Sequence, residues 1–339
     1  MRFLLDEEQA EFGRTLGRML AAADTPAAVR AWGAGDRDPG HAVWRRLAEA
    51  GVFGLAVPEK YGGAGFLPVE LVAAFVELGR YAVPGPVVET VAAAVLLDRL
   101  GDAAPAGTWL PAIAAGDAVV SYADLTCGPY ALDAASADAT FLISGGTLRR
   151  AEGNGPVQPS VDPARRLVRC EESGGAVLAS GPAVRAAAAY AGDTARLLTA
   201  AQALGVGRRL LDDTVAYVKQ RTQFGVAVGS FQAVKHRLAD VLLGLEFAEP
   251  LVYGAAVELA GAGEAGSGEA GIGIAMAKAA AGEAAHAAAR TALQSHGALG
   301  YTDELHLSLW MRKARALRGA WGTPAECRAR VLPSPGPEG

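Results

Sequence analysis

The sequence predicts a mainly α-helical protein with a small β-domain in the middle of the chain. Apolar residues recur at helical spacing in the first third and again from about residue 186. Between these zones, short apolar runs alternate with Gly, Pro, Asp and Asn, which is typical of short strands and turns. We therefore expect an N-terminal helical domain, a reduced middle β-domain, a C-terminal helical bundle and a flexible tail, at residues 1–115, 116–185, 186–333 and 334–339.

The N-terminal domain is predicted to begin with a helix. Leu5, Phe12 and Leu16 recur at helix-like spacing around the acidic run "DEE", which suits a helix N-terminus. A further helix in "HAVWRRLAEAG" ends near Gly51 and leads through an extended piece to the loop "PEKYGGAG". This loop lacks the setting and spacing of a phosphate-binding fingerprint, so we interpret it as a surface turn. "PVELVAAFVELGRYA" predicts another amphipathic helix.

The rest of the chain divides into short strands and then long helices. Strands are predicted in "AVVSYADL", "ATFLISGG", "RLVRC" and "GAVLA". Long helical runs with short connections follow and predict an antiparallel four-helix bundle. These runs cover residues 186–219, 230–261, 270–298 and 303–318. The Gly-rich linker "GAGEAGSGEAG" between the second and third runs is expected to be mobile.

Composition excludes several classes of function. Of the 339 residues, 51% are hydrophobic and 20% charged, and the net charge is −5 without a basic stripe, so we expect no nucleic-acid partner. The opening "MRFLLDEEQAEF" does not resemble a signal peptide, and no apolar run reaches the ~18 residues of a membrane span. Cys127, Cys170 and Cys327 show no metal-binding spacing. A cytoplasmic protein without a metal site is expected.

The segment "RTQFG" is the first candidate binding motif. Arg221 and Gln223 are fixed-charge and amide donors at the end of a long helical run, with Phe224 beside them and Gly225 able to form a tight turn. A guanidinium group binds phosphate oxygens in a bidentate fork, so this segment could clamp a pyrophosphate. A plain helix–helix corner is the alternative, and spacing alone leaves it open.

The segment "LQSHGALGYTDELHL" is the second candidate. Gln294 precedes Gly297 and Gly300, and glycines between helices allow a ligand to approach the backbone closely. The alternative is a glycine-containing turn between two helices. Lone histidines are weak evidence for catalysis, so His236 and His296 are interpreted as packing or hydrogen-bonding residues.

Together, four segments resemble the acyl-CoA dehydrogenase family, nearly from end to end. They are "FLLDEEQAEF", "WRRLAEAGVFGLAVPEKYGGAGF", "RTQFGVAVGSFQAVKHRLAD" and "QSHGALGYTDELHL". The resemblance implies the same three-domain fold, FAD, α,β-oxidation of an acyl-CoA, electron-transfer flavoprotein as acceptor, and tetramers built from dimers. It also implies that the flavin lies across a subunit interface. The residues carried over are Arg221, Gln223 and Phe224 on the pyrophosphate side, and Gln294 and Gly297 on the adenosine-pyrophosphate side.

The resemblance fails where the family places its catalytic base. The reaction needs a carboxylate to remove the α-proton while hydride leaves Cβ. In most members a glutamate precedes a Gly-Thr, and here Trp321 stands in "GAWGTPAE". A second branch carries the base in a Leu-Glu-Arg-Leu helix, and here Ala195 stands in "DTARLL". The family's Thr-Glu-Pro, Gly-Ser-Asp and Trp-Ile-Thr-like motifs, which hold the flavin ring, are missing from the middle domain as well.

Three hypotheses follow. In the first, the chain is the non-catalytic subunit of a heteromeric acyl-CoA dehydrogenase. It resembles those of actinobacterial α2β2 assemblies, some of which act on steroid side-chain CoA thioesters. It would be inactive alone and would share FAD with a base-bearing partner that holds most of the acyl-CoA. In the second, it is a self-sufficient enzyme with a displaced acid, Asp193 or Glu326. In the third, it is a flavin-free structural or regulatory homologue.

Overall fold

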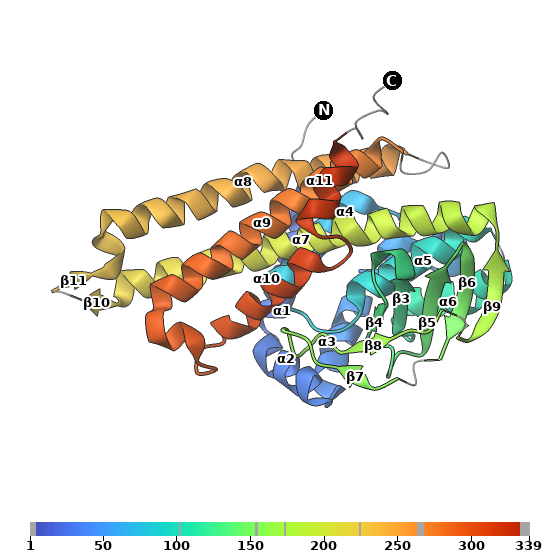
Figure 1. Cartoon of the computed structure of the whole chain (residues 1–339), viewed down its shortest axis with the longest axis horizontal. Helices are drawn as coiled ribbons and strands as arrows, with labels where there is room; N and C mark the ends of the chain where they lie inside the picture. Colours follow the sequence, from blue (N-terminus) through green and yellow to red (C-terminus); the bar gives the residue numbers. More distant parts are fainter. Residues whose placement is uncertain are drawn as a thin grey trace, which may run out of the picture.

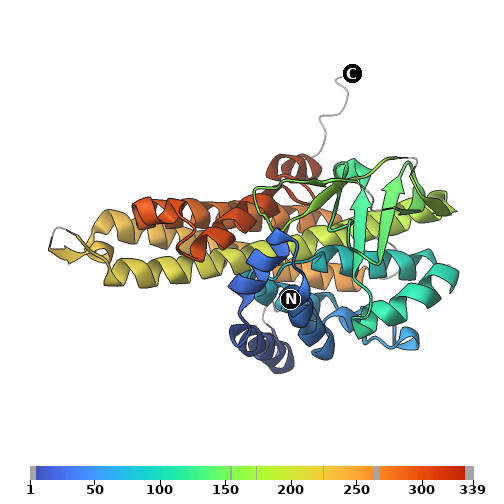
Figure 2. The ribbon, with the colours of Figure 1, turned by 90° about the horizontal axis from the view of Figure 1, so that it is seen from below.

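The computed structural model describes residues 5–101, 103–152, 155–172, 174–223, 225–262 and 268–332. The molecule is mainly helical, with a small β-region lying beside one half of a long helical bundle (Figures 1 and 2). The predicted fold class is therefore confirmed. Phe224, the predicted tail and the centre of the Gly-rich linker lie outside the described residues.

The N-terminal part consists of helices that pack against the bundle. They are α1 (Glu7–Ala21), α2 (Thr25–Ala34), α3 (Asp38–Glu49), α4 (Pro68–Arg80), α5 (Val87–Leu100) and α6 (Ala103–Ala115). As the acidic run predicts, α1 begins with a capping box, in which Asp6 accepts from the amide of Gln9 and the Gln9 side chain accepts from the amide of Asp6.

The loop "PEKYGGAG" lies between the short paired strands β1 (Ala56–Val57) and β2 (Gly65–Phe66), next to the 3-10 turns η1 (Phe53–Leu55) and η2 (Glu59–Tyr61). It is more closely packed than a surface turn requires. A Cβ atom at Gly63 would collide with the carbonyl of Val57, so the close approach of the two backbone segments demands glycine there.

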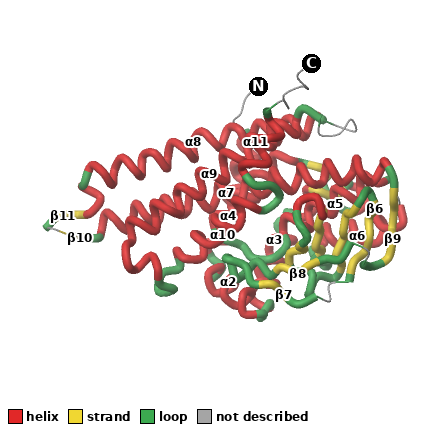
Figure 3. The backbone as a smooth tube through the Cα atoms, in the orientation of Figure 1, coloured by secondary structure: helices red, strands yellow, loops and turns green. Residues whose placement is uncertain are grey.

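The β-region has two small sheets (Figure 3). The strands are β3 (Val120–Asp124), β4 (Tyr130–Leu132), β5 (Ala139–Ser144), β6 (Thr147–Ala151), β7 (Val157–Gln158), β8 (Leu167–Arg169) and β9 (Ala176–Ser180), and η3 (Leu125–Cys127) follows β3. One sheet has the order β3-β5-β6-β9 and the other β4-β8-β7. Strands β3 and β5 are parallel, and the other pairs are antiparallel.

Helix α5 is fixed to the start of β3. The hydroxyl of Thr90 donates to the carbonyl of Val120 at 2.6 Å and accepts from the Val120 amide at 3.2 Å. The neighbouring residue on α5, Glu89, is consequently held beside the β-region, although α5 belongs to the N-terminal part of the chain.

The C-terminal part is built on the helices α7 (Pro182–Gln220), α8 (Gln232–Gly261), α9 (Ala270–His296), α10 (Leu307–Gly319) and α11 (Pro324–Val331). A hairpin of β10 (Thr222–Gln223) and β11 (Val226–Ala227), followed by η4 (Val228–Ser230), connects α7 to α8, and η6 (Gly297–Tyr301) follows α9. Helix α10 begins four residues later than predicted. The side chain of Asp303 accepts from Ser308 and Arg312 instead of starting the helix itself.

Glycines allow α4 to cross α7 closely. A Cβ at Gly205 of α7 would collide with the carbonyl of Val76, and a Cβ at Gly79 of α4 with the carbonyl of Gln202. The backbones of the two helices therefore touch at this crossing, which joins the N-terminal part to the bundle.

Candidate functional site

The two predicted binding segments lie at the same end of the bundle. Tyr217, one turn before Arg221 on α7, stacks on His296 at the end of α9, with ring centroids 4.0 Å apart and an interplanar angle of 23°. His296 lies between Gln294 and Gly297, and its Nδ1 is 2.8 Å from the carbonyl oxygen of Ala292. The structure thus assigns His296 a packing and hydrogen-bonding role, as predicted.

The predicted side chains at this end are available for a ligand. Arg221 and Gln223 are exposed, and the Arg221 guanidinium makes no hydrogen bond or ion pair with the described residues. Among the described residues, the Gln223 amide donates to the neighbouring Thr222 carbonyl alone, at 2.8 Å. Gln294 and Gly297 are exposed too, and Gly297 ends α9 with φ +59°, a left-handed conformation that favours glycine.

A groove beside Gln294 adds positive charge that the sequence analysis missed. It has a volume of about 510 Å³, lies between α8 and α9, and its lining includes Arg237, Arg290 and one acid, Asp240, together with Gln294 and the 79% exposed Tyr301. Neither arginine forms an ion pair with a described acid. Arg290 precedes Gln294 by one helical turn, so this spacing could have revealed it from the sequence. The exposed guanidinium groups suit an anionic pyrophosphate.

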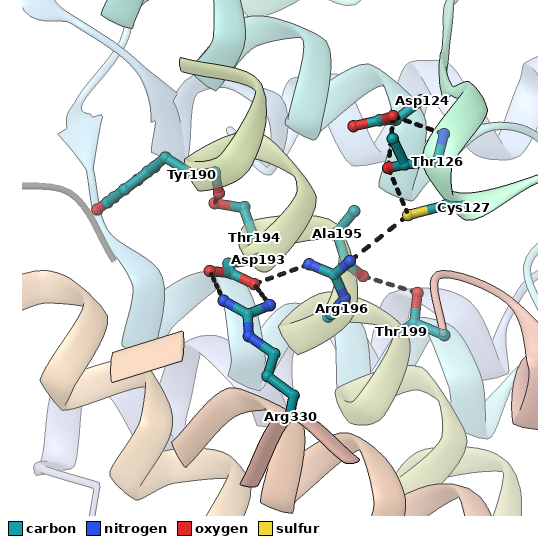
Figure 4. A network of polar contacts seen from close by, with 10 residues as sticks. All are labelled: Asp124, Thr126, Cys127, Tyr190, Asp193, Thr194, Ala195, Arg196, Thr199 and Arg330. Atoms are coloured by element: carbon teal, nitrogen blue, oxygen red, sulfur yellow. Dashed lines mark hydrogen bonds and ion pairs between the residues drawn. The ribbon is translucent and has the colours of Figure 1, made fainter. Parts of the chain in front are cut away.

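Ala195 lies in the interior of α7 (Figure 4). It is 0% exposed, and its carbonyl oxygen accepts from the Thr199 hydroxyl at 2.7 Å. Its methyl side chain has no atom that can accept a proton.

Trp321 stands in the short loop between α10 and α11, with φ +56°. Lys278 of α9 fixes this loop, because its Nζ donates to the carbonyl oxygens of Leu317 at 3.0 Å, Arg318 at 3.2 Å and Gly322 at 3.1 Å. The carbonyls of Leu317 and Arg318 belong to the last turn of α10, so the ammonium group serves as a C-terminal cap and also joins the helix to the loop at Gly322. Burial lowers the pKa of Lys278 to about 8.

Trp321 borders a cavity of about 260 Å³ between the β-region and the end of α10. Its ring stacks on Tyr122 of β3, with centroids 5.3 Å apart and an interplanar angle of 12°, and its Nε1 donates to Oε1 of Glu89 at 3.2 Å. Glu89 is 3% exposed and lies 4.0 Å from a guanidinium nitrogen of Arg165. Burial raises the pKa of Glu89, and the positive charge of Arg165 opposes this shift.

The sequence analysis missed Glu89 entirely. The signal available was a single acid in the otherwise apolar helix "VVETVAAAVLL", all of which is buried. The sequence does not show, however, that α5 contacts β3 and that Glu89 consequently accepts a hydrogen bond from Trp321.

The two acids predicted as displaced bases have structural partners. Asp193 is 0% exposed and accepts from two nitrogens of Arg330, at 2.6 and 2.8 Å, and from Arg196 at 2.8 Å (Figure 4). Glu326 forms a capping box at the start of α11 with Thr323, whose amide donates to it at 2.7 Å and holds the pKa of Glu326 below its usual value. Both carboxylates are therefore engaged in holding helices.

The described part of the chain shows neither a metal centre nor a membrane-spanning helix. Within it, no cluster of three or more His, Cys, Asp or Glu residues could hold a metal ion. Of the helices described, none has the length and apolar character to cross a membrane.

Comparison with known proteins gives a consistent result. Residues 6–117 match the acyl-CoA dehydrogenase N-terminal domain, and residues 158–331 match the acyl-CoA dehydrogenase C-terminal domain. The chain is 32% identical over 328 residues to acyl-CoA dehydrogenase IpdE2 of Mycobacterium tuberculosis, covering 96% of each chain.

Two solved structures extend the likeness to the fold. A chain of the ChsE4-ChsE5 complex from Mycobacterium tuberculosis superposes with a TM-score of 0.82 at 25% identity, over 98% of this chain and 100% of that chain. The Tcur3481-Tcur3483 steroid ACAD G363A variant gives a TM-score of 0.81 at 23% identity, over 96% of each chain, and shows the shared fold.

Proposed function

Since the chain belongs to the acyl-CoA dehydrogenase family, we propose that it is the base-lacking subunit of a heteromeric, FAD-dependent acyl-CoA dehydrogenase. Members of this family are oxidoreductases that bind FAD. The proposed role of this chain is to bind, with the end of its helical bundle, part of a flavin that is held mainly by a second, base-bearing subunit.

The observation that carries the proposal is that neither Ala195 nor Trp321, where the sequence resemblance places the base, has a carboxylate. Ala195 is buried and aliphatic, and Trp321 presents an indole whose N–H is a donor only. The two acids that could have replaced the base, Asp193 and Glu326, are committed to Arg330 and Thr323. Nothing at these four positions is free to accept a proton from a carbon acid.

The end of the bundle retains groups that fit the other half of a flavin site. Arg221 and Gln223 are proposed to bind the pyrophosphate together with Phe224, and Gln294 and Gly297 to bind its adenosine side. The guanidinium of Arg221, which has no partner among the described residues, and the two arginines of the adjacent groove support this assignment. When bound, the flavin would supply the hydride acceptor, whereas these residues would bind and orient its phosphates.

A partner chain is supported by exposed apolar residues on the bundle. Leu243 and Phe247 are one turn apart on α8 and are 53% and 73% exposed, and Ile272 and Met276 are one turn apart on α9 and are 43% and 42% exposed. Surfaces of this type mark contacts with other proteins. We propose that the base-bearing subunit also holds most of the acyl-CoA, a steroid side-chain CoA thioester, and that electron-transfer flavoprotein reoxidises the flavin. A cytoplasmic location stays a prediction.

The proposal is tested by the flavin content of the complex with a base-bearing partner, purified by a tag on the partner. Arg221→Ala should weaken FAD binding to the complex by about 10-fold, because a charge-assisted contact to the pyrophosphate is lost. Arg169→Ala is the matched control, since Arg169 is exposed on β8 and belongs to neither site. Flavin content that is unchanged in Arg221→Ala would favour a flavin-free structural role instead.

A self-sufficient dehydrogenase is a second candidate, and one observation favours it. The carboxyl group of Glu89 lines the cavity beside Trp321, so this chain retains an acid in that cavity, although in a different place from either base position. Activity of the chain expressed alone, abolished by Glu89→Gln, would support this function and refute the base-lacking role.

A further inference from the structure

We infer that residues 159–166 form a strap across the mouth of the cavity beside Trp321, and that the buried ion pair of Asp162 with Lys313 is the latch that holds the strap closed. The strap is a conformational device within this chain, which goes beyond the proposed contribution to a partner's flavin. Its opening would admit a molecule to the cavity without unfolding the rest of the protein.

The strap connects the two-residue strand β7 to β8 and forms part of the cavity wall. Ser160, Val161 and Arg165 line the cavity, and Val161 is at the same time 54% exposed. A residue that both lines a cavity and faces solvent lies at the mouth of that cavity. Movement of this segment away from the helices would therefore widen the entrance.

The main chain of the strap has few attachments to the rest of the molecule. Pro159 and Pro163 have no amide hydrogen to donate. Among the described residues, the hydrogen bonds that the other amides of the strap donate end on acceptors within the strap itself. The end of the strap is tied by its main chain, because the Arg166 carbonyl accepts from the Asp133 amide at 2.7 Å. The strap is therefore held closed mainly by its side chains.

The side chain of Asp162 is the buried anchor of the strap. Asp162 is 1% exposed, and its Oδ2 lies 3.6 Å from Nζ of Lys313 on α10, whose side chain is 6% exposed. This distance is that of an ion pair without a direct hydrogen bond, and Oδ2 has no hydrogen-bond partner among the described residues. The Lys313 ammonium donates to the Val83 carbonyl at 3.3 Å. Water would solvate both charges when the strap lifts, so separating this pair costs less than separating a tight one.

Other side chains of the strap contact the helices in a similar way. Arg165 lies 4.0 Å from Glu89 of α5. A guanidinium nitrogen of Arg166 donates to the Gly33 carbonyl of α2 at 3.3 Å. Pro163 packs against Gly33, where an added Cβ would lie 3.1 Å from the Pro163 Cβ. These contacts can be lost without breaking a strand pairing, as expected for a segment that opens locally.

Trypsin detects the open strap, because cleavage after Arg165 or Arg166 requires this segment to leave the helices. Cleavage of these two bonds in the purified full-length chain is followed by peptide mass spectrometry at low concentrations of urea. The rate should rise far less steeply with urea than the global unfolding constant does, because a local opening exposes little surface. A rate that follows global unfolding overturns the inference.

The latch is tested by neutralising its acid. Asp162→Asn should raise the cleavage rate by about 10-fold or more, because the Lys313 ammonium loses its partner. Asp213→Asn is the matched control and should leave the rate unchanged, since Asp213 pairs with Arg209 at 2.8 Å on α7 and does not line the cavity. Addition of Lys313→Met to Asp162→Asn removes the unpaired ammonium, so the double variant should be cleaved no faster than Asp162→Asn. Equal rates in the wild type and Asp162→Asn, or a double variant that is cleaved faster, overturn the latch.

Control of access to the cavity is tested with a thiol introduced by Leu132→Cys and with N-ethylmaleimide as the probe. Leu132 is 4% exposed and lines the cavity. Asp162→Asn should raise the labelling rate of the introduced thiol by the same factor as tryptic cleavage, because both reactions require the open strap. Cys327 is 3% exposed and does not line this cavity, so its labelling rate is the internal control and should not change. Faster cleavage without faster labelling overturns the gating role, whatever the flavin content of the complex.

Discussion

At the scale of single residues, the structure separates acids that hold the fold from acids that face a cavity. Asp193 attracted attention in the sequence because it lies two residues from Ala195. Its oxygens accept hydrogen bonds from Arg330 and Arg196, and it is fully buried. Sequence proximity therefore suggested a base, whereas the fold uses the residue to join α7 to α11.

Asp193→Asn should consequently reduce stability rather than chemistry. The change leaves Arg330 and Arg196 facing a neutral amide, and breaking a buried ion pair typically costs about 3 kcal/mol or more. Urea unfolding measures the loss. The activity of the assembled complex, expressed per folded molecule, should stay within about 2-fold of the wild-type value. A fully folded variant without activity would show that Asp193 acts in the reaction.

The buried carboxyl group of Asp133 should make the free energy of unfolding depend on pH. It is 1% exposed, and burial raises its pKa from 3.8 to about 7, although the Trp32 N–H opposes this shift. Between these two values the unfolded chain has released the proton that the folded chain retains. The free energy of unfolding should therefore fall as the pH rises through this window.

Asp133→Asn removes this dependence and keeps an oxygen for the Trp32 N–H. The variant should gain stability relative to the wild type between pH 4 and pH 7, by up to ~4 kcal/mol at the upper end. Urea unfolding at several pH values measures the difference. A difference that does not vary with pH would mean that Asp133 ionises normally in the folded protein.

At the scale of elements, Lys278 shows how a buried cation can fix a loop. Its three carbonyl partners lie at the end of α10 and around Trp321. Lys278→Met preserves most of the apolar stem and removes all three donors. We expect a loss of about 2–3 kcal/mol of stability and a weaker Tyr122–Trp321 stack, because buried carbonyls are left unsatisfied. Unchanged stability and near-ultraviolet circular dichroism would contradict this role.

The crossing of α4 and α7 provides a second test at this scale. Gly205→Ala places a Cβ against the carbonyl of Val76 and should cost at least ~2 kcal/mol of stability, because the helices must separate. Gly13→Ala in α1 is the matched control, since nothing lies within 4 Å of its added Cβ. That change should be neutral or stabilising by up to ~1 kcal/mol. Similar effects of the two changes would argue against close packing at the crossing.

The elements were predictable wherever local spacing determines them. The helical zones and the short strands between them follow from periodicity and turn residues, and α1 starts where its acidic run indicates. The later start of α10 was not predictable, because Asp303 pairs with side chains that come after it. Glu89 was missed for a related reason, since its role depends on contacts of α5 with strands and loops far away in the sequence.

At the scale of the whole molecule, we propose that the chain combines a retained flavin half-site with a second half that has lost its base. The bundle end keeps Arg221, Gln223, Gln294 and Gly297 exposed, and the Tyr217–His296 stack holds the two segments at the same end. Trp321, which stands where the sequence resemblance places the base of most family members, borders the cavity near the β-region. This difference between the two halves is the reason for proposing a shared flavin. The proposal depends on both halves together and not on any single residue.

The flavin content and activity of the chain, expressed alone and together with a base-bearing partner, test this account most directly. The chain alone should be colourless and inactive. The co-purified complex should be yellow, oxidise its acyl-CoA and hold one FAD for each base-bearing subunit. A yellow, active homo-oligomer of this chain alone would contradict it.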